Sequence, residues 1–242
     1  MNRRPVFRRL VLAVALAATA GARANTAVEP VPRDAGWVKR HEGFVAIARA
    51  GGVDVLFLGD SITDAWRNRG KAVWDKYYAG LHAANFGISG DRTQHVLWRM
   101  DHGELDGIHP KVVILMIGTN NTGIERDRPV ARNTPAEAIA GVTAVVQELR
   151  TKLPDTKILL LAILPRADTV GPKPGDICEI NAAVAQLADG RNIRFLDLGP
   201  RFLAPDGTLA ADDFMPDHLH PGPKGYEVWA EAMQEPLAQL LQ

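Results

Sequence analysis

The sequence predicts an α/β fold in which a five-stranded parallel sheet is covered by helices on both faces. Near-continuous apolar runs are the first indication, because strands that are buried on both faces of a sheet carry such runs. Helical patterns between these runs are the second indication, since alternating strands and helices predict β–α–β units. The expected strands are Val53–Leu58, His82–Phe86, Lys111–Ile117, Lys157–Ile163 and Ile193–Leu196.

The expected helices follow from apolar residues that recur at helical spacing. Gly51 and Gly52 predict the end of the first helix, because glycine commonly terminates helices. Thr134, Pro135 and Glu137 predict the start of another, with a capping threonine, proline in the first position and glutamate in the third. The predicted helices are Gly36–Ala50, Thr63–Lys76, Arg92–Arg99, Thr134–Lys152, Cys178–Ala188 and Lys224–Gln242.

Composition is typical of one globular domain and argues against several classes of partner. The 242 residues are 46% hydrophobic and 23% charged, with a net charge of zero. Nucleic-acid-binding domains usually carry a basic excess, and no basic amphipathic stretch indicates a membrane surface. The single cysteine, Cys178, forms no internal disulfide and is expected to be a small buried apolar residue.

The first residues have the layout of a secretory signal peptide. Four arginines precede an uncharged apolar run, Leu10–Ala20, and the pattern Ala22-Arg23-Ala24 then offers a cleavage site. The run is shorter than the roughly 20 residues that a membrane-spanning helix needs. We therefore expect a signal peptide at 1–24, a proline-rich linker at 25–35, one globular domain at 36–242, and export to the periplasm or the medium.

Polar residues follow the ends of the first three expected strands and gather again near the C-terminus. The segments are Gly59–Thr63, Gly87–Asp91, Gly118–Asn121 and Asp217–His220. In open parallel sheets, functional groups collect beyond the carboxyl ends of the strands. A hydroxyl, two glycine turns, an amide and a carboxylate–imidazole pair are the parts of an acyl-transfer site.

Ser61, His220 and Asp217 are the expected catalytic residues. Serine is a weak nucleophile that needs an adjacent base, histidine titrates near neutrality, and a carboxylate fixes the tautomer of the imidazole. Residues three apart on a helical turn share one face, so that Asp217 can touch His220. Pro221-Gly222-Pro223 follows and prevents a long helix, which places the pair on a turn or loop.

The tetrahedral oxyanion of acyl transfer needs hydrogen-bond donors aimed at it. We expect these donors to be the backbone N–H groups of Ser61 and Gly90 and the side-chain amide of Asn120. Asn121 is expected to be structural. Asp60 is expected to support the loop of the nucleophile by hydrogen bonding.

These blocks resemble those of the GDSL or SGNH hydrolases, a family of serine esterases and lipases. The resemblance implies a flavodoxin-like α/β/α sandwich of three layers and no cofactor. Ser61 matches the nucleophile, Gly90 and Asn120 the oxyanion donors, and His220 with Asp217 the remaining pair. Within the family, the segments Asn85–Asp91 and His95–Arg99 look most like the catalytic α subunits of platelet-activating-factor acetylhydrolase. The first block reads Gly-Asp-Ser-Ile where the family name implies leucine.

Two other classes of function remain open from the sequence. Asp217, His218 and His220 would be metal ligands in a metal-dependent phosphoesterase, with Asp60 or Asn120 completing the site. A non-catalytic glycan-binding relative is the second alternative. Ser89 and His218 are the rival nucleophile and the rival base.

The loops Asn121–Asn133 and Arg166–Gly175 are expected to wall the pocket. They are polar and contain no obvious apolar lid. This favours small-molecule esters with acetyl or other short acyl groups, on a carbohydrate or a lipid.

Overall fold

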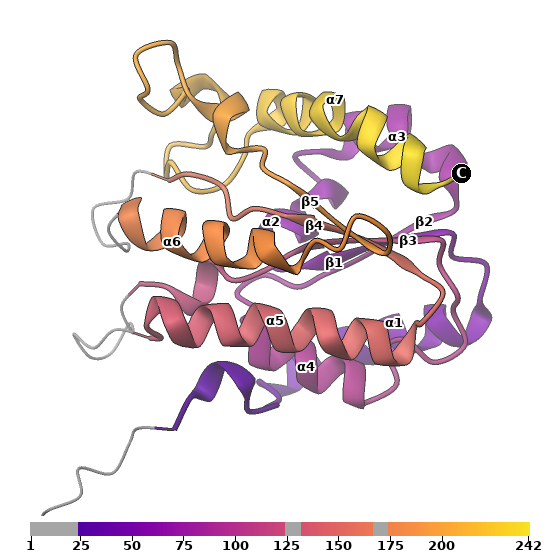
Figure 1. The fold of residues 1–242 in the computed structure, drawn as a ribbon. Coiled ribbons are helices and arrows are strands. Elements are labelled where there is room, and N and C mark those ends of the chain that lie inside the picture. Colours follow the sequence, from indigo (N-terminus) through magenta and orange to yellow (C-terminus); the bar gives the residue numbers. More distant parts are fainter. Residues whose placement is uncertain (1–23, 124–131, 167–173) are drawn as a thin grey trace, which may run out of the picture.

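The computed structural model describes residues 24–123, 132–166 and 174–242 (Figure 1). The expected signal peptide therefore lies outside the described residues, except for Ala24. The central parts of the two loops expected to wall the pocket also lie outside them. No helix within the described ranges is long and apolar enough to cross a bilayer.

The five expected strands are confirmed and form one parallel sheet. Its order is β2-β1-β3-β4-β5, so that β1 lies next to the edge strand β2, and β3, β4 and β5 follow in sequence on the other side of β1. The register pairs Gly59 with both Gly87 and Met116, which brings the carboxyl ends of three strands to one edge. The strands are β1 Val55–Gly59, β2 Ala83–Gly87, β3 Val112–Met116, β4 Lys157–Leu161 and β5 Ile193–Leu196.

Helices cover both faces, so the fold is the expected three-layer α/β/α sandwich (Figure 1). Alternate strand residues supply the two cores: Leu56 and Leu58 pack against one helical layer, and Val55 and Phe57 against the other. One layer contains α1 Ala35–Ala50, α4 Thr93–Asp101, α5 Pro135–Lys152 and α6 Pro174–Val184. The other contains α2 Ser61–Asp64, α3 Lys71–Tyr77 and α7 Pro223–Leu240.

The helix expected over Thr63–Lys76 is wrong as a single element. The chain instead forms α2, a 3-10 turn at Ala65–Arg67, and then α3. Gly70 lies so close to its neighbours that an added Cβ would be 2.6 Å from Trp66 Cε3 and 2.9 Å from the ring of Tyr226. Tertiary packing around Trp66, which is fully buried, therefore interrupts the helix.

Two further expectations need correction on α6. The helix begins four residues before Cys178, because Pro174 suits a first helical turn. Cys178 is exposed, which contradicts its expected burial. The buried stripe of α6 consists of Ile177, Ile180 and Val184, and Cys178 projects about 100° away from Ile177 around the helix.

The stretch 25–35, expected as a linker, packs on the domain. It contains a 3-10 turn at Thr26–Val28, in which Ala27 is fully buried. Ala27 O accepts a hydrogen bond from Thr93 Oγ1 (2.7 Å), and Val31 N donates to Gln94 O (3.3 Å). These residues are therefore ordered against the start of α4.

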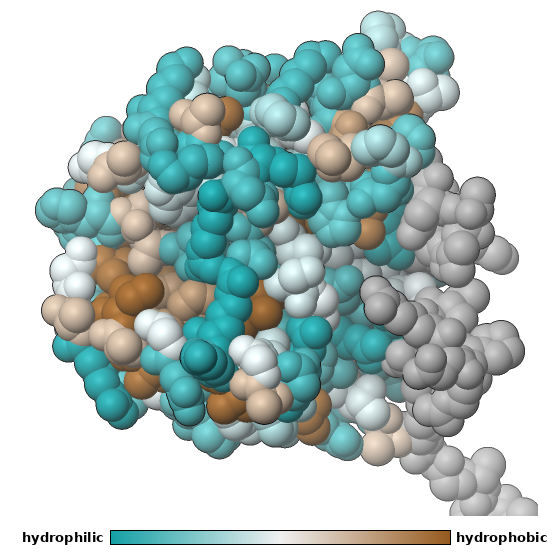
Figure 2. Space-filling model, turned by 180° about the vertical axis from the view of Figure 1, so that it is seen from behind, coloured by the Kyte–Doolittle hydropathy of each residue, from teal (hydrophilic) through white to brown (hydrophobic). Residues whose placement is uncertain are grey.

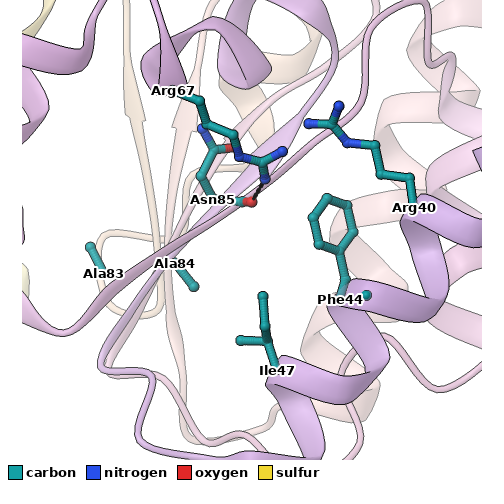
Figure 3. Close-up of a pocket in the computed structure, with 8 residues that line it drawn as sticks. Arg40, Phe44, Ile47, Arg67, Ala83, Ala84 and Asn85 are labelled. Carbon is teal, nitrogen blue, oxygen red and sulfur yellow. Dashed lines mark hydrogen bonds between the residues drawn. The ribbon is translucent and has the colours of Figure 1, made fainter.

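Strand β2 forms one edge of the sheet, and side chains occupy some of its outward-facing polar groups. Asn85 O accepts a hydrogen bond from Arg67, which Figure 3 shows as a dashed line. Gly87 N donates to the side chain of Asn85 (2.9 Å), and Gly87 O accepts from Arg40 (3.3 Å). A groove of about 480 Å³ runs between this edge and α1, with Phe44 and Ile47 on its other wall (Figure 3). Figure 2 shows the molecule from the side opposite to the view in Figure 1, and on this face a line of hydrophilic side chains crosses an apolar area.

Candidate active site

Ser61 lies at the carboxyl edge of the sheet, as the first residue of α2 and two residues after β1. The turn is tight: a Cβ on Gly59 would lie 2.3 Å from both Met116 O and Thr63 Oγ1. Asp60 caps α2, because its Oδ1 accepts a hydrogen bond from Ile62 N (2.9 Å). Asp60 thus supports the loop of Ser61, in the way expected from the sequence.

Ser61, His220 and Asp217 form one hydrogen-bonded chain, although 159 residues separate Ser61 from His220. Ser61 Oγ lies 2.8 Å from His220 Nε2, and His220 Nδ1 lies 2.7 Å from Asp217 Oδ2. The second oxygen, Oδ1, accepts from the backbone N–H groups of Leu219 and His220 (both 3.0 Å). The pair lies on a tight turn closed by a hydrogen bond from Met215 N to His220 O (2.8 Å).

The surroundings of Asp217 favour its charged form. Partial burial opposes ionisation, but the backbone N–H and the ring of His220 and the N–H of Leu219 lower the pKa of Asp217 to about 2. An ionised carboxylate accepts the Nδ1 proton of His220. That tautomer leaves Nε2 with a lone pair directed at Ser61 Oγ.

The rival residues do not reach this chain of hydrogen bonds. His218 adopts a left-handed backbone conformation with φ of 50° and is exposed, one residue beyond Asp217. Ser89 is also exposed, and its carbonyl oxygen accepts from Arg33 Nη1 (2.7 Å). Of the candidate nucleophiles and bases, Ser61 and His220 are the two that the structure brings together.

The three expected oxyanion donors follow the ends of β1, β2 and β3. No hydrogen bond links the N–H of Ser61 or of Gly90 to another residue in the described part of the chain. Gly90 has a φ of 81°, a conformation that glycine adopts without strain. Asn120 Nδ2 donates to Asp91 O (3.0 Å), which leaves the second amide hydrogen for another acceptor.

Asn121 is structural, as expected. It is fully buried, its Oδ1 accepts from Thr93 N (3.0 Å), and its Nδ2 lies within 3.2 Å of oxygens on Thr93, Gln94 and Asn133. Asn121 therefore connects the loop after β3 to α4 and fixes the position of the neighbouring Asn120.

Asp60 is 1% exposed, and its Oδ2 has no hydrogen-bond partner within the described ranges. Burial raises the pKa of Asp60 to about 7 and outweighs the hydrogen bond from Ile62, while the nearby charge of Asp91 raises the pKa further. A carboxyl group that titrates near neutrality therefore lies beside Ser61.

Sequence reasoning missed two residues beside Gly90. Asp91 is fully buried, and its Oδ1 accepts from Trp37 Nε1 (2.7 Å) and from Arg33 Nη1 (3.0 Å). Its Oδ2 lies 3.2 Å from Nε of the fully buried Arg99. Arg33 belongs to the stretch expected as a linker, and its sequence neighbours carry no pattern that identifies it.

The other histidines are buried against the core or lie on the surface, as expected. His95 is half-buried, and burial lowers its pKa to about 3. No group of three or more His, Cys, Asp or Glu side chains is placed to hold a metal ion within residues 24–123, 132–166 and 174–242. Of the side chains considered as metal ligands, Asp217 and His220 contact each other, and His218 does not complete a group of three with them in the described structure.

Comparisons with known proteins show the family of the chain. The model of the GDSL-like lipase/acylhydrolase family matches residues 57–228. Platelet-activating factor acetylhydrolase IB subunit alpha2 of Rattus norvegicus is 37% identical over 221 residues, which cover 89% of this chain and 90% of the relative.

Solved structures share the fold. A GDSL-like lipase from Bacteroides thetaiotaomicron superposes with a TM-score of 0.64 at 19% identity, over 83% of this chain and 97% of that one. An acetyl xylan esterase superposes with a TM-score of 0.59 at 25% identity, over 76% and 98%. The protein is thus an ester-hydrolysing enzyme, and its chain belongs to the GDSL-like lipase/acylhydrolase family.

Proposed function

We propose that this enzyme hydrolyses carboxylic esters through a covalent acyl-enzyme on Ser61. The hydrogen-bonded chain from Ser61 through His220 to Asp217 is the observation that carries the proposal. His220 Nε2 is at the distance required of a general base, and the ionised Asp217 holds the Nδ1 proton on the ring. Asp217 also stabilises the imidazolium that forms when Ser61 loses its proton.

The reaction proceeds by double displacement. Ser61 Oγ attacks the ester carbonyl while His220 accepts its proton, and the oxyanion binds to the N–H groups of Ser61 and Gly90 and to the Asn120 amide. His220 then protonates the leaving alcohol. In the second half, His220 takes a proton from water, which attacks the acyl-enzyme and releases the acid and Ser61. These steps require no cofactor.

Acetyl or another short acyl group, on a carbohydrate or lipid alcohol, is the substrate class that the proposal favours. The names of two similar proteins, platelet-activating factor acetylhydrolase and acetyl xylan esterase, both specify acetyl. The described ends of the two pocket loops are polar: Arg166 donates to Thr119 Oγ1 (2.9 Å), and Arg132 donates to Asn120 O (3.1 Å). Neither loop sequence offers an apolar lid for a long chain.

Hydrolysis of p-nitrophenyl esters from acetate to palmitate tests the proposal. We expect turnover that is fastest with acetate, survives EDTA and is lost in Ser61→Ala. Ser89→Ala is the matched control, because Ser89 is exposed and has no base beside its hydroxyl in the described structure. Turnover that EDTA removes and Ser61→Ala retains would support the metal-dependent phosphoesterase instead. No turnover with any ester would favour a glycan-binding protein.

We also propose that the protein is exported and that the mature chain begins at Asn25. The arginine-rich start, the run Leu10–Ala20 and the pattern Ala22-Arg23-Ala24 support this. Expression in a bacterial host, followed by cell fractionation and N-terminal sequencing, tests it. A cytoplasmic product that starts at Met1 would contradict the proposal.

A further inference from the structure

Arg33 bridges the two residues on either side of Gly90. Its Nη1 donates to Ser89 O (2.7 Å) and to Asp91 Oδ1 (3.0 Å). The guanidinium group also lies against Gly90 itself, because a Cβ on Gly90 would be 3.3 Å from both Nη1 and Nη2. The turn that carries the Gly90 N–H is closed by a hydrogen bond from Asp91 N to Ile88 O (3.2 Å), and Arg33 holds its two ends from outside.

Asp91 connects this turn to the second expected oxyanion donor. Its backbone oxygen accepts the hydrogen bond from Asn120 Nδ2 (3.0 Å), while its buried carboxylate receives Arg33 and the indole N–H of Trp37 (2.7 Å). A displacement of Asp91 would thus move both the Gly90 N–H and the Asn120 amide. Two donors depend on one buried residue.

Arg33 reaches this position because the segment before it is ordered. Ala27 is buried against Thr93, and Val31 N donates to Gln94 O. The side chain of Arg33 keeps 31% of its exposure, whereas Arg99, the other cation on Asp91, is fully buried. The core thus holds the carboxylate through Arg99 and Trp37, and Arg33 contributes its contacts at the exposed side of the Gly90 turn.

We propose that Arg33 is a positioning residue for the oxyanion site, acting on Gly90 directly and on Asn120 through Asp91. It holds the Gly90 N–H toward the position of the developing anion and adds a positive charge next to that turn. The inference rests on the proposed function, since it takes Gly90 and Asn120 as oxyanion donors. Misplaced donors weaken binding of the transition state more than binding of the ester, so the effect falls on kcat rather than on KM.

The test compares Arg33→Met, Arg33→Lys and wild type in p-nitrophenyl acetate hydrolysis, with thermal unfolding of each protein. Arg49→Met is the matched control, since Arg49 is exposed in the last turn of α1 and has no hydrogen bond or ion pair in the described structure. We expect Arg33→Met to lower kcat about tenfold or more with KM within about twofold of wild type. Arg33→Lys keeps the charge and should recover part of kcat, and Arg49→Met should match wild type.

A kcat of folded Arg33→Met within about twofold of wild type would overturn the inference, and so would a loss that appears only in KM. If Arg33→Met does not fold, the kcat of Arg33→Lys tests the inference instead, because the shorter lysine side chain should still lower kcat measurably. Ser61→Ala is assayed in parallel. Activity retained by Ser61→Ala would refute the proposed function, whereas activity lost there and unchanged in the Arg33 variants would refute only the role of Arg33.

Discussion

Replacing Asp60 with asparagine should make the stability of the protein less sensitive to pH. Burial raises the pKa of Asp60 from 3.8 to about 7, so the folded state keeps a proton that the unfolded chain has already released in this interval. Folding therefore takes up a proton, and the free energy of unfolding falls as pH rises from about 4 to about 7. A difference of about three pKa units corresponds to at most about 4 kcal/mol.

Asparagine keeps the acceptor for Ile62 N but carries no charge that must be buried. Asp60→Asn should therefore resemble wild type at pH 4 and exceed its stability by up to about 4 kcal/mol at pH 8. Urea unfolding at both pH values measures this difference, and titrating groups that do not interact with Asp60 cancel between the two proteins. Asp155→Asn is the control, because Asp155 is exposed and its charge is not buried on folding. An equal difference between Asp60→Asn and wild type at both pH values would refute the reasoning.

Three further changes have defined outcomes. Asp217→Asn should lower kcat at least about tenfold, because the amide no longer fixes the tautomer of His220. In wild type, the pKa of Asp217 is about 2, so the pH profile of kcat/KM should show no ionisation of this carboxyl above pH 4. An unchanged kcat in this variant would contradict its role. Gly87→Ala should lower the Tm strongly or prevent folding, because its Cβ would lie 2.3 Å from Asp64 N; a Tm equal to wild type would show that the turn adjusts. Thr134→Ala should cost about 1 kcal/mol in urea unfolding with activity unchanged, because α5 loses its cap.

The strands and the local site pair could be predicted because their signals are local. Residues 112–117 and 158–163 are buried on both faces, so their apolar runs are continuous and distinctive. The spacing of Asp217 and His220 predicts their contact without knowledge of the fold, although the observed turn is formed by hydrogen bonds to Asp217 Oδ1 rather than by a helix. The residues at the strand ends meet because parallel strands end at one edge.

The remaining features depend on contacts between distant parts of the chain. Gly70 interrupts the helix after β1 because Trp66 and Tyr226 leave no room there, and Tyr226 lies far along the sequence. Arg33 contacts Asp91 across 58 residues, and no periodic pattern marks either residue. The proline-rich stretch 25–35 has the composition of a linker, and only its contacts with α4 show where its residues pack.

The open edge of the sheet has a consequence for self-association. At the β2 edge, a strand from a second molecule could extend the sheet only by pairing with the outward N–H and C=O groups of β2. Arg67 already occupies the carbonyl oxygen of Asn85 (Figure 3). Arg40 occupies the carbonyl oxygen of Gly87, and the Asn85 side chain occupies Gly87 N. An incoming strand would have to displace two guanidinium groups, each held also by Asp64, before it could pair with Asn85 O or Gly87 O. The side chains of Arg40, Arg67 and Asn85 thus hinder the addition of a further strand at the β2 edge, which lies next to the Gly-Asp-Ser-Ile block after β1.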